Sequence, residues 1–201
     1  MGIEIFVALM LGVSLSACCG FRVFLPLLLA SLASYFNWLP DGISTTIPWL
    51  GSLQAVITFS IAALIEIVGY YVPVVDNFLD MIATPLAIAA GTLLTGSFLQ
   101  IDNEMIKWAL GLIVGGGAAG VVQGGTVLTR LLSSKTTLGT GNGLFATGEN
   151  TMALTCTIFS FIVPVIAGVL ALIIIGLMIY FMKRARNSLL KLRQVNNSAE
   201  I

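Results

Sequence analysis

Long apolar stretches separated by short polar segments make up most of the chain. A helix that crosses the ~30 Å hydrocarbon core of a bilayer needs about 20 apolar residues, each rising 1.5 Å. Runs of about this length or longer cover residues 3–38, 53–72, 77–99, 105–132 and 151–183. The pattern predicts an all-α, polytopic transmembrane bundle of five or six spans.

The first run, 3–38, is too long for one upright helix. Arg22 and Pro26 lie near its middle, where a charge and a helix breaker coincide. We therefore expect this segment to be broken, tilted or re-entrant, and the span count depends on whether it crosses once or in two pieces. A gap-free alignment of 8–30 with 109–131 gives a faint internal repeat, of a kind used to build transporters, and chance similarity between apolar segments is the alternative.

Later breaks are indicated by proline and by polar residues. Asp76 is the expected N-cap of the 77–99 helix, and Pro85 predicts a kink in it. Pro164 predicts a kink in the last run. The polar stretch 133–150 is expected to be a loop.

Composition decides the environment of this helical protein. Hydrophobic residues make up 58% of the chain and charged residues 9%, and the mean hydropathy is +1.04. Such a chain is incompatible with a soluble globule and is expected to bind the lipid bilayer rather than nucleic acid. Five of the nine Lys and Arg residues lie in the last nineteen positions. The positive-inside rule therefore predicts a membrane domain over 1–183 and a basic cytoplasmic tail over 184–201.

Histidine is absent, and the three cysteines (Cys18, Cys19 and Cys156) lack the paired spacing of metal sites. We expect them to be small packing residues, with no metal ion and no cofactor bound. A paired nucleophile and base are also missing from the pattern, so an enzyme is not expected.

Ionisable residues inside apolar runs are the candidate functional residues, because each is costly to bury unless paired or hydrated. Asp76 and Asp80 are four residues apart and share a helix face, which calls for a cation, a proton or an arginine between them. Arg22 is the expected partner, with Glu66 nearby. One interpretation is a proton- or cation-responsive cluster, and the alternative is an ion-pair network that only joins helices.

Glycines at four-residue spacing mark the 105–132 helix. They predict close packing against a neighbouring helix, and we expect this helix to be the most enclosed of the bundle. A pore lining is the alternative interpretation, and a homo-oligomer or a membrane partner could also dock there. These glycines are Gly111, Gly115, Gly116, Gly120 and Gly124.

Three motifs occur together along the chain: GFRVFLP at 20–26, PVVDN at 73–77 followed by Asp80 and Pro85, and TT at 136–137 followed by GN at 141–142 and Glu149. In this combination the chain resembles an uncharacterised bacterial membrane family, catalogued as a domain of unknown function with the number four-one-two-six, from about Leu11 to Ile175. Gly143 stands where that family's pattern has a proline. The resemblance implies a small multi-pass inner-membrane protein whose polar positions form a shared core, and it supplies no activity.

The favoured function is a small-solute or ion transporter or channel-like protein in the bacterial inner membrane. The alternative is a non-transporting subunit or scaffold that packs against a partner through its glycine-rich helix. A solvent-accessible cavity lined by the charged residues favours the first, and a dry, fully paired cluster favours the second. The candidate substrate- or ion-binding residues are Arg22, Glu66, Asp76, Asn77, Asp80, Arg130, Asn142 and Glu149.

Overall fold

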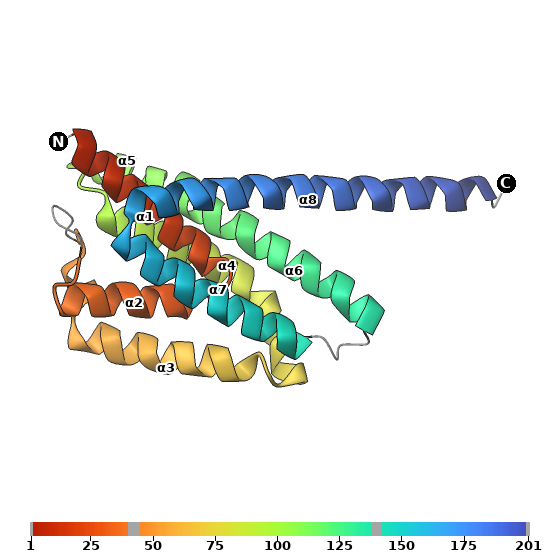
Figure 1. Ribbon diagram of the computed structural model, residues 1–201, viewed down its shortest axis with the longest axis horizontal. Coiled ribbons are helices and arrows are strands. Elements are labelled where there is room, and N and C mark those ends of the chain that lie inside the picture. The colour runs from red at the N-terminus through yellow and green to blue at the C-terminus, as the bar shows by residue number, and fades with distance from the viewer. Residues whose placement is uncertain (1, 40–44, 138–141, 200–201) are drawn as a thin grey trace.

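The computed structural model describes residues 2–39, 45–137 and 142–199, without the side chains of 73, 74, 77, 131–137, 142 and 185–199 (Figure 1). Every regular element in these ranges is helical, which confirms the all-α prediction. The elements are α1 (Gly2–Cys19), α2 (Phe24–Tyr35), a 3₁₀ turn (Pro48–Gly51), α3 (Leu53–Gly69), α4 (Pro73–Phe98), α5 (Glu104–Leu110), a π-helical segment (Gly111–Gly116), α6 (Gly117–Thr137), α7 (Asn142–Ile162) and α8 (Pro164–Ala199).

Four of these helical stretches are long and apolar enough to cross a membrane: Gly2–Cys19, Phe78–Phe98, Glu104–Arg130 and Pro164–Arg184. Two further apolar helices, α2 and α3, are shorter. At 1.5 Å per residue the 12 residues of α2 rise only about 18 Å. The expected five or six spans are therefore not confirmed.

The first apolar run is broken, as its length and its internal Arg22 predicted. α1 ends at Cys19, and α2 begins at Phe24 and runs back toward the end of the bundle where the chain starts (Figure 1). The turn between them is closed by backbone hydrogen bonds from Gly20 N to Ala17 O (3.0 Å) and from Arg22 N to Cys18 O (3.2 Å). The segment aligned with it in the expected repeat, 109–131, is one continuous rod, so the two halves of that alignment differ in shape.

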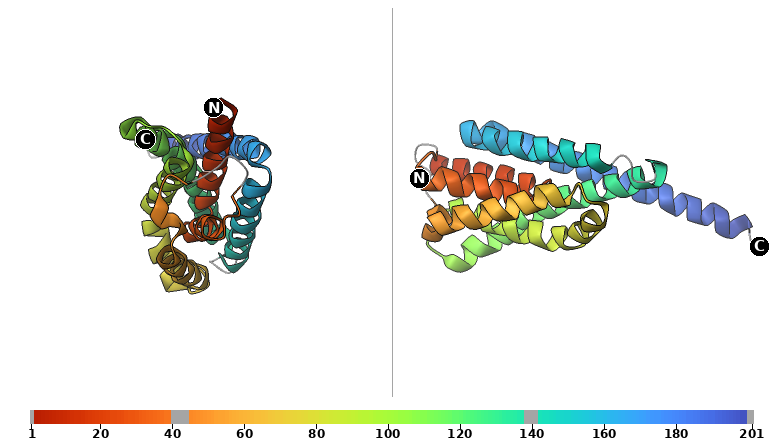
Figure 2. Two further views of the ribbon diagram at one scale, coloured as in Figure 1. Left: turned by 90° about the vertical axis from the view of Figure 1, so that its left-hand side faces the viewer. Right: turned by 90° about the horizontal axis from the view of Figure 1, so that it is seen from below.

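α1 is the central helix of the bundle and contacts α2, α4, α6, α7 and α8. In α1 61% of the residues are buried, against 39% of an 18-residue window within the 104–130 stretch. The expectation that the glycine-rich helix is the most enclosed is therefore wrong. The reason is that α1 runs through the bundle and five later helices pack around it (Figure 2).

The glycine-rich stretch nevertheless packs closely, because Gly111, Gly115, Gly116 and Gly120 face α4 and Gly124 faces Met182 of α8. A Cβ added at Gly111 would lie 2.9 Å from Thr92 O, and one at Gly116 would lie 2.7 Å from Thr92 Oγ1. Gly115 meets the backbone of Gly91 on the same helix. Further along, Gly125 faces Met178 of α8. This packing supports the predicted role of the glycines, while docking of a partner chain through them stays a prediction.

The π-helical segment explains how two sets of glycines reach one neighbour. Gly111 and Gly115 form one four-residue spacing, and Gly116 and Gly120 form another that is offset by one residue. In a regular α-helix that offset turns the second set by about 100°. A π-bulge accommodates one extra residue per turn, so both sets face α4.

Two local predictions were wrong, and the kink predicted at Pro85, which lies inside the continuous helix α4, stays a prediction. α4 begins at Pro73 with Val72 as its N-cap, so Asp76 lies inside the first turn. The expected loop at 133–150 is mostly helix, because α6 extends to Thr137 and α7 starts at Asn142.

The last apolar run is divided at Val163, where α7 ends and α8 begins with Pro164. Proline favours the first turn of a helix because its missing N–H is not needed there. α8 then continues without interruption to Ala199, across the expected boundary at residue 183. Its C-terminal end projects beyond the other helices (Figure 1).

Candidate functional site

Six charged residues from five segments of the chain gather near one end of the bundle. We call Arg22, Glu66, Asp76, Asp80, Arg130 and Glu149 the charge cluster. Arg22 lies in the turn after α1, Glu66 in the last turns of α3, and Asp76 and Asp80 in the first turns of α4. Arg130 comes from α6 and Glu149 from α7. The site thus forms where helices that are distant in sequence begin or end.

Arg130 joins three carboxylates. Its Nη1 donates to Asp76 Oδ1 (3.0 Å) and to Asp80 Oδ1 (2.8 Å). Its Nε donates to Glu149 Oε1 (3.0 Å), and its Nη2 donates to Glu149 Oε2. The planar guanidinium therefore makes a two-point contact with Glu149 on one edge and holds the two aspartates together on the other. The arginine required between the aspartates is Arg130.

Arg22 is the most deeply buried member of the charge cluster, with 1% of its side chain exposed. Its Nη1 lies 3.1 Å from Glu149 Oε2, and its Nη2 donates to the carbonyl oxygen of Ala146 (3.1 Å). Its Nε donates to Asn150 Oδ1. A carboxylate partner for Arg22 was predicted among Glu66, Asp76 and Asp80, but its ion pair is instead with Glu149 of α7.

Glu66 acts on the backbone of the broken helix. Its Oε1 accepts from Val23 N (2.7 Å), and its Oε2 accepts from Phe24 N (2.9 Å). These N–H groups belong to the start of α2, where a helix leaves its first donors unsatisfied and carries a partial positive charge. Glu66 therefore caps α2 across a distance of more than 40 residues in sequence, and it holds the α1–α2 break in place.

Tyr70 lies against both arginines, an arrangement that the sequence analysis missed. The Cζ atom of Arg22 is 3.8 Å from the ring centroid, and that of Arg130 is 4.3 Å from it. An aromatic face attracts cations and supplies no countercharge of its own. Tyr70 is buried next to the residue where α3 ends. The one sequence feature that could have indicated Tyr70 is its position in the turn between Gly69, where α3 ends, and Pro73, where α4 begins.

Access to the charge cluster is uneven. Asp80 has 23% of its side chain exposed, whereas Asp76 and Arg130 have 6% and Glu149 has 9%. Within the described part of the chain, every buried side-chain nitrogen and oxygen has a hydrogen-bond partner. The cluster is thus paired throughout, with Asp80 at its rim. The side chains of the candidates Asn77 and Asn142 lie outside the described residues.

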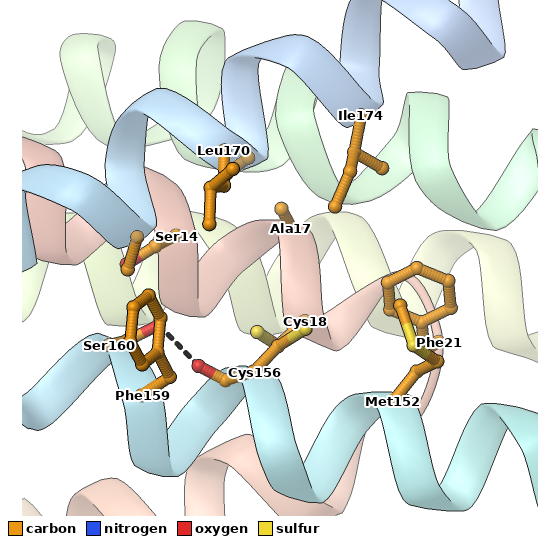
Figure 3. A pocket seen from close by; sticks show the side chains of 12 residues that line it. Ser14, Ala17, Cys18, Phe21, Met152, Cys156, Phe159, Ser160, Leu170 and Ile174 are labelled. Atoms are coloured by element: carbon orange, nitrogen blue, oxygen red, sulfur yellow. Dashed lines mark hydrogen bonds between the residues drawn. The ribbon is translucent and has the colours of Figure 1, made fainter.

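A separate cavity of about 240 Å³ lies between α1, α7 and α8. Its walls include Cys18, Cys156 and Phe159, and in Figure 3 the two thiols lie side by side within it. None of the six members of the charge cluster lines this cavity. Among the residues that the structure describes, no Cys, Asp or Glu side chains form a group of three that could hold a metal ion.

Four helices long and apolar enough to cross a membrane, with charged side chains buried between helices, are consistent with a multi-pass helical membrane protein. Residues 9–184 match the family described as a domain of unknown function, DUF4126. The chain therefore belongs to the DUF4126 family, as the three motifs had indicated. No curated protein and no solved structure matches the chain.

Proposed function

We propose that the protein is a small transporter or channel-like protein of the bacterial inner membrane, and that protonation of its charge cluster controls the passage. The proposal places the C-terminal basic tail in the cytoplasm. The proposal includes no enzymatic activity and no cofactor. The observation that carries it is the charge balance of the cluster.

The cluster contains four carboxylates and two guanidinium groups, a formal charge of −2 when all six are ionised. The N-terminal ends of α2 and α4, next to Glu66 and Asp76, offset about half a charge each. The six side chains therefore hold more carboxylates than guanidinium groups in a largely buried site, where charge is expensive to bury. A proton on one carboxylate would reduce this imbalance, which supports a proton-responsive site.

A proton is the cation that best fits this geometry. Arg130 already occupies the space between Asp76 and Asp80, so a metal ion would have to displace it. A proton on one aspartate needs no additional space. Asp80 is the residue that can exchange it, because its carboxylate is the most exposed of those that Arg130 binds.

The depth of the site supports transport as well. The aromatic residues Tyr35, Phe36 and Trp38 are exposed at the end of α2, as expected at a membrane interface. From there the 12 residues of α2 rise about 18 Å, which is well short of a 30 Å hydrocarbon layer. The break that carries Arg22 would then lie within the membrane, where non-helical backbone occurs chiefly beside protein or a pathway.

The test is ion flux in vesicles. The full chain is reconstituted into liposomes that contain a pH-sensitive dye, and proton flux is followed under an imposed pH gradient, with Na⁺ or K⁺ gradients in parallel. We expect protein-dependent flux that is lost in Asp80→Asn. Glu104→Gln is the control, because Glu104 also pairs with a basic residue, Lys107, yet is largely exposed.

A scaffold is the second candidate, and the full pairing of the cluster favours it. The charged residues are satisfied, and the described cavity lies elsewhere. The partner surface would then be the exposed face of the glycine-rich helix around Leu112 and Ile113, because most of the glycines face α4 or α8. Absence of flux under all three gradients, together with a folded Asp80→Asn protein of unchanged behaviour, would reject transport and support the scaffold.

A further inference from the structure

The cavity between α1, α7 and α8 has a wall that is almost wholly apolar. Its two serines use their hydroxyl donors on their own helices: Ser14 Oγ donates to Leu11 O (2.9 Å), and Ser160 Oγ donates to Cys156 O (2.7 Å). The other lining residues are Ala, Cys, Met, Phe, Leu and Ile. A polar ligand would find no free donor here.

Water is an unsuitable occupant for the same reason. At about 240 Å³ the cavity is large beside the ~30 Å³ that one water takes up in the liquid, but a buried water needs two to four polar partners. An empty space of this size would leave the side chains around it without dispersion contacts. The physics of the wall therefore favours a hydrocarbon occupant.

The cavity opens toward the lipid-facing side of the bundle. Met152 of α7 and Leu170 of α8 line it and are also 43% and 45% exposed, so they form its rim. Large apolar side chains such as Ile158, Ile166 and Ile173 are exposed on the same two helices. In a membrane these helices face acyl chains, so the medium at the rim is itself hydrocarbon.

We infer that this cavity binds one hydrocarbon chain of a membrane lipid, which enters between α7 and α8 and ends against α1. Ala17 and Cys18 of α1 form the inner wall, and Phe21 lies beside them at the turn. The next residue along the chain is Arg22, so the bound chain lies beside the break that carries the charge cluster. This inference does not depend on the proposed transport.

The test uses photochemical labelling of the full chain in detergent. The probe is palmitic acid that carries a diazirine on its chain, and the adducts are mapped by peptide mass spectrometry. We expect adducts on the inner wall, at Ala17 or Cys18, besides those on the outer surface. Ala17 and Cys18 are at most 4% exposed, so a probe that only coats the protein cannot reach them. Labelling confined to outward-facing residues such as Ile158 and Ile173 would overturn the inference.

A substitution that fills the cavity provides the control. Ala17→Leu should lower inner-wall labelling at least fivefold, while Ala89→Leu, the same change at an exposed site on α4, should leave it unchanged. Should Ala17→Leu fail to fold, a competition experiment on the wild-type protein provides the test. An unlabelled lipid should then reduce the adducts on the inner wall saturably and leave those on the outer surface unchanged. Palmitic acid and a polyprenyl phosphate are compared as competitors, and the stronger one identifies a fatty acyl or an isoprenoid chain. Failure of both to compete would contradict the inference.

Discussion

Arg130 and Glu149 are nineteen residues apart and form two parallel N–H···O contacts, Nε to Oε1 at 3.0 Å and Nη2 to Oε2. The same Glu149 carboxylate also binds Arg22. One carboxylate on α7 therefore holds α6 and the turn after α1 at once.

Glu149→Gln should be the most damaging single change in the charge cluster. It leaves two buried guanidinium groups without a shared countercharge, and breaking a buried ion pair costs about 3–5 kcal/mol. We expect a correspondingly lower free energy of unfolding, measured by denaturant titration of the protein in detergent. Glu104→Gln is the control and should have no measurable effect, because its carboxylate is 68% exposed. An equal loss for both variants would show that burial does not set the effect.

Gly115→Ala should destabilise the bundle, whereas Gly117→Ala, two residues later, should not. A Cβ at Gly115 would collide with the backbone of Gly91, which cannot move aside like a side chain, and overpacking of this kind costs about 1–3 kcal/mol. A Cβ at Gly117 meets no atom within 4 Å, so alanine there should stabilise the helix by about 0.5–1 kcal/mol. Melting temperatures of the two variants in one detergent test this directly. A destabilised Gly117→Ala would contradict the packing described.

The contacts rank the glycines of this helix by the atoms that an added side chain would meet. Gly111 faces the carbonyl oxygen of Thr92, and Gly120 faces only the side chain of Ile88, at 3.2 Å. Gly111→Ala should therefore cost more stability than Gly120→Ala, as thermal unfolding of the pair would show.

Glu66→Gln should loosen the start of α2. An amide offers one oxygen where the carboxylate offers two, so either Val23 N or Phe24 N loses its acceptor, at about 1–3 kcal/mol. Hydrogen exchange measured by mass spectrometry should become faster at residues 22–26. Gln54→Ala, at an exposed position of the same helix, should not change it. Unchanged exchange in Glu66→Gln would mean that the cap is dispensable.

The two chain ends should report opposite sides of the membrane. The N-terminus lies at one end of the bundle, and α8 extends away from the other (Figure 1). A fluorescent protein fused after Ile201 should fluoresce, and alkaline phosphatase fused there should be inactive, because the basic tail is expected in the cytoplasm. The same reporters fused before Met1 should give the reverse pattern. Identical patterns at both ends would contradict this topology.

Sequence reasoning found the members of the charge cluster but not their pairing. Charge inside an apolar run is visible in one dimension, so Arg22, Asp76 and Arg130 could all be singled out. Which arginine meets which carboxylate depends on how the helices pack. Both arginines lie over the same ring of Tyr70, so they occupy neighbouring positions in the cluster. Residue type and spacing in the sequence therefore could not tell which arginine binds the two aspartates.

The fold shows the same division. The break near Arg22 and the close glycine packing were predictable, because a charge, a proline or a small residue affects the helix at its own position in the sequence. The π-helical segment at 111–116 was not predictable, since it depends on the surface that α4 presents. The polar stretch 133–150 looked like a loop from its Gly, Thr and Asn content, yet α6 and α7 continue into it. Its polarity is compatible with helices that pass beyond the hydrocarbon layer.

The 36 residues of α8 form one rod about 54 Å long, of which about 24 Å extends past a 30 Å hydrocarbon layer. Such a rod acts as a lever arm. A change of 10° in its tilt within the bundle would swing its far end by roughly 9 Å, if the helix stays straight over its ~54 Å. Small movements of α8 where Met178 meets Gly125 would therefore produce larger displacements at the C-terminal end of the helix.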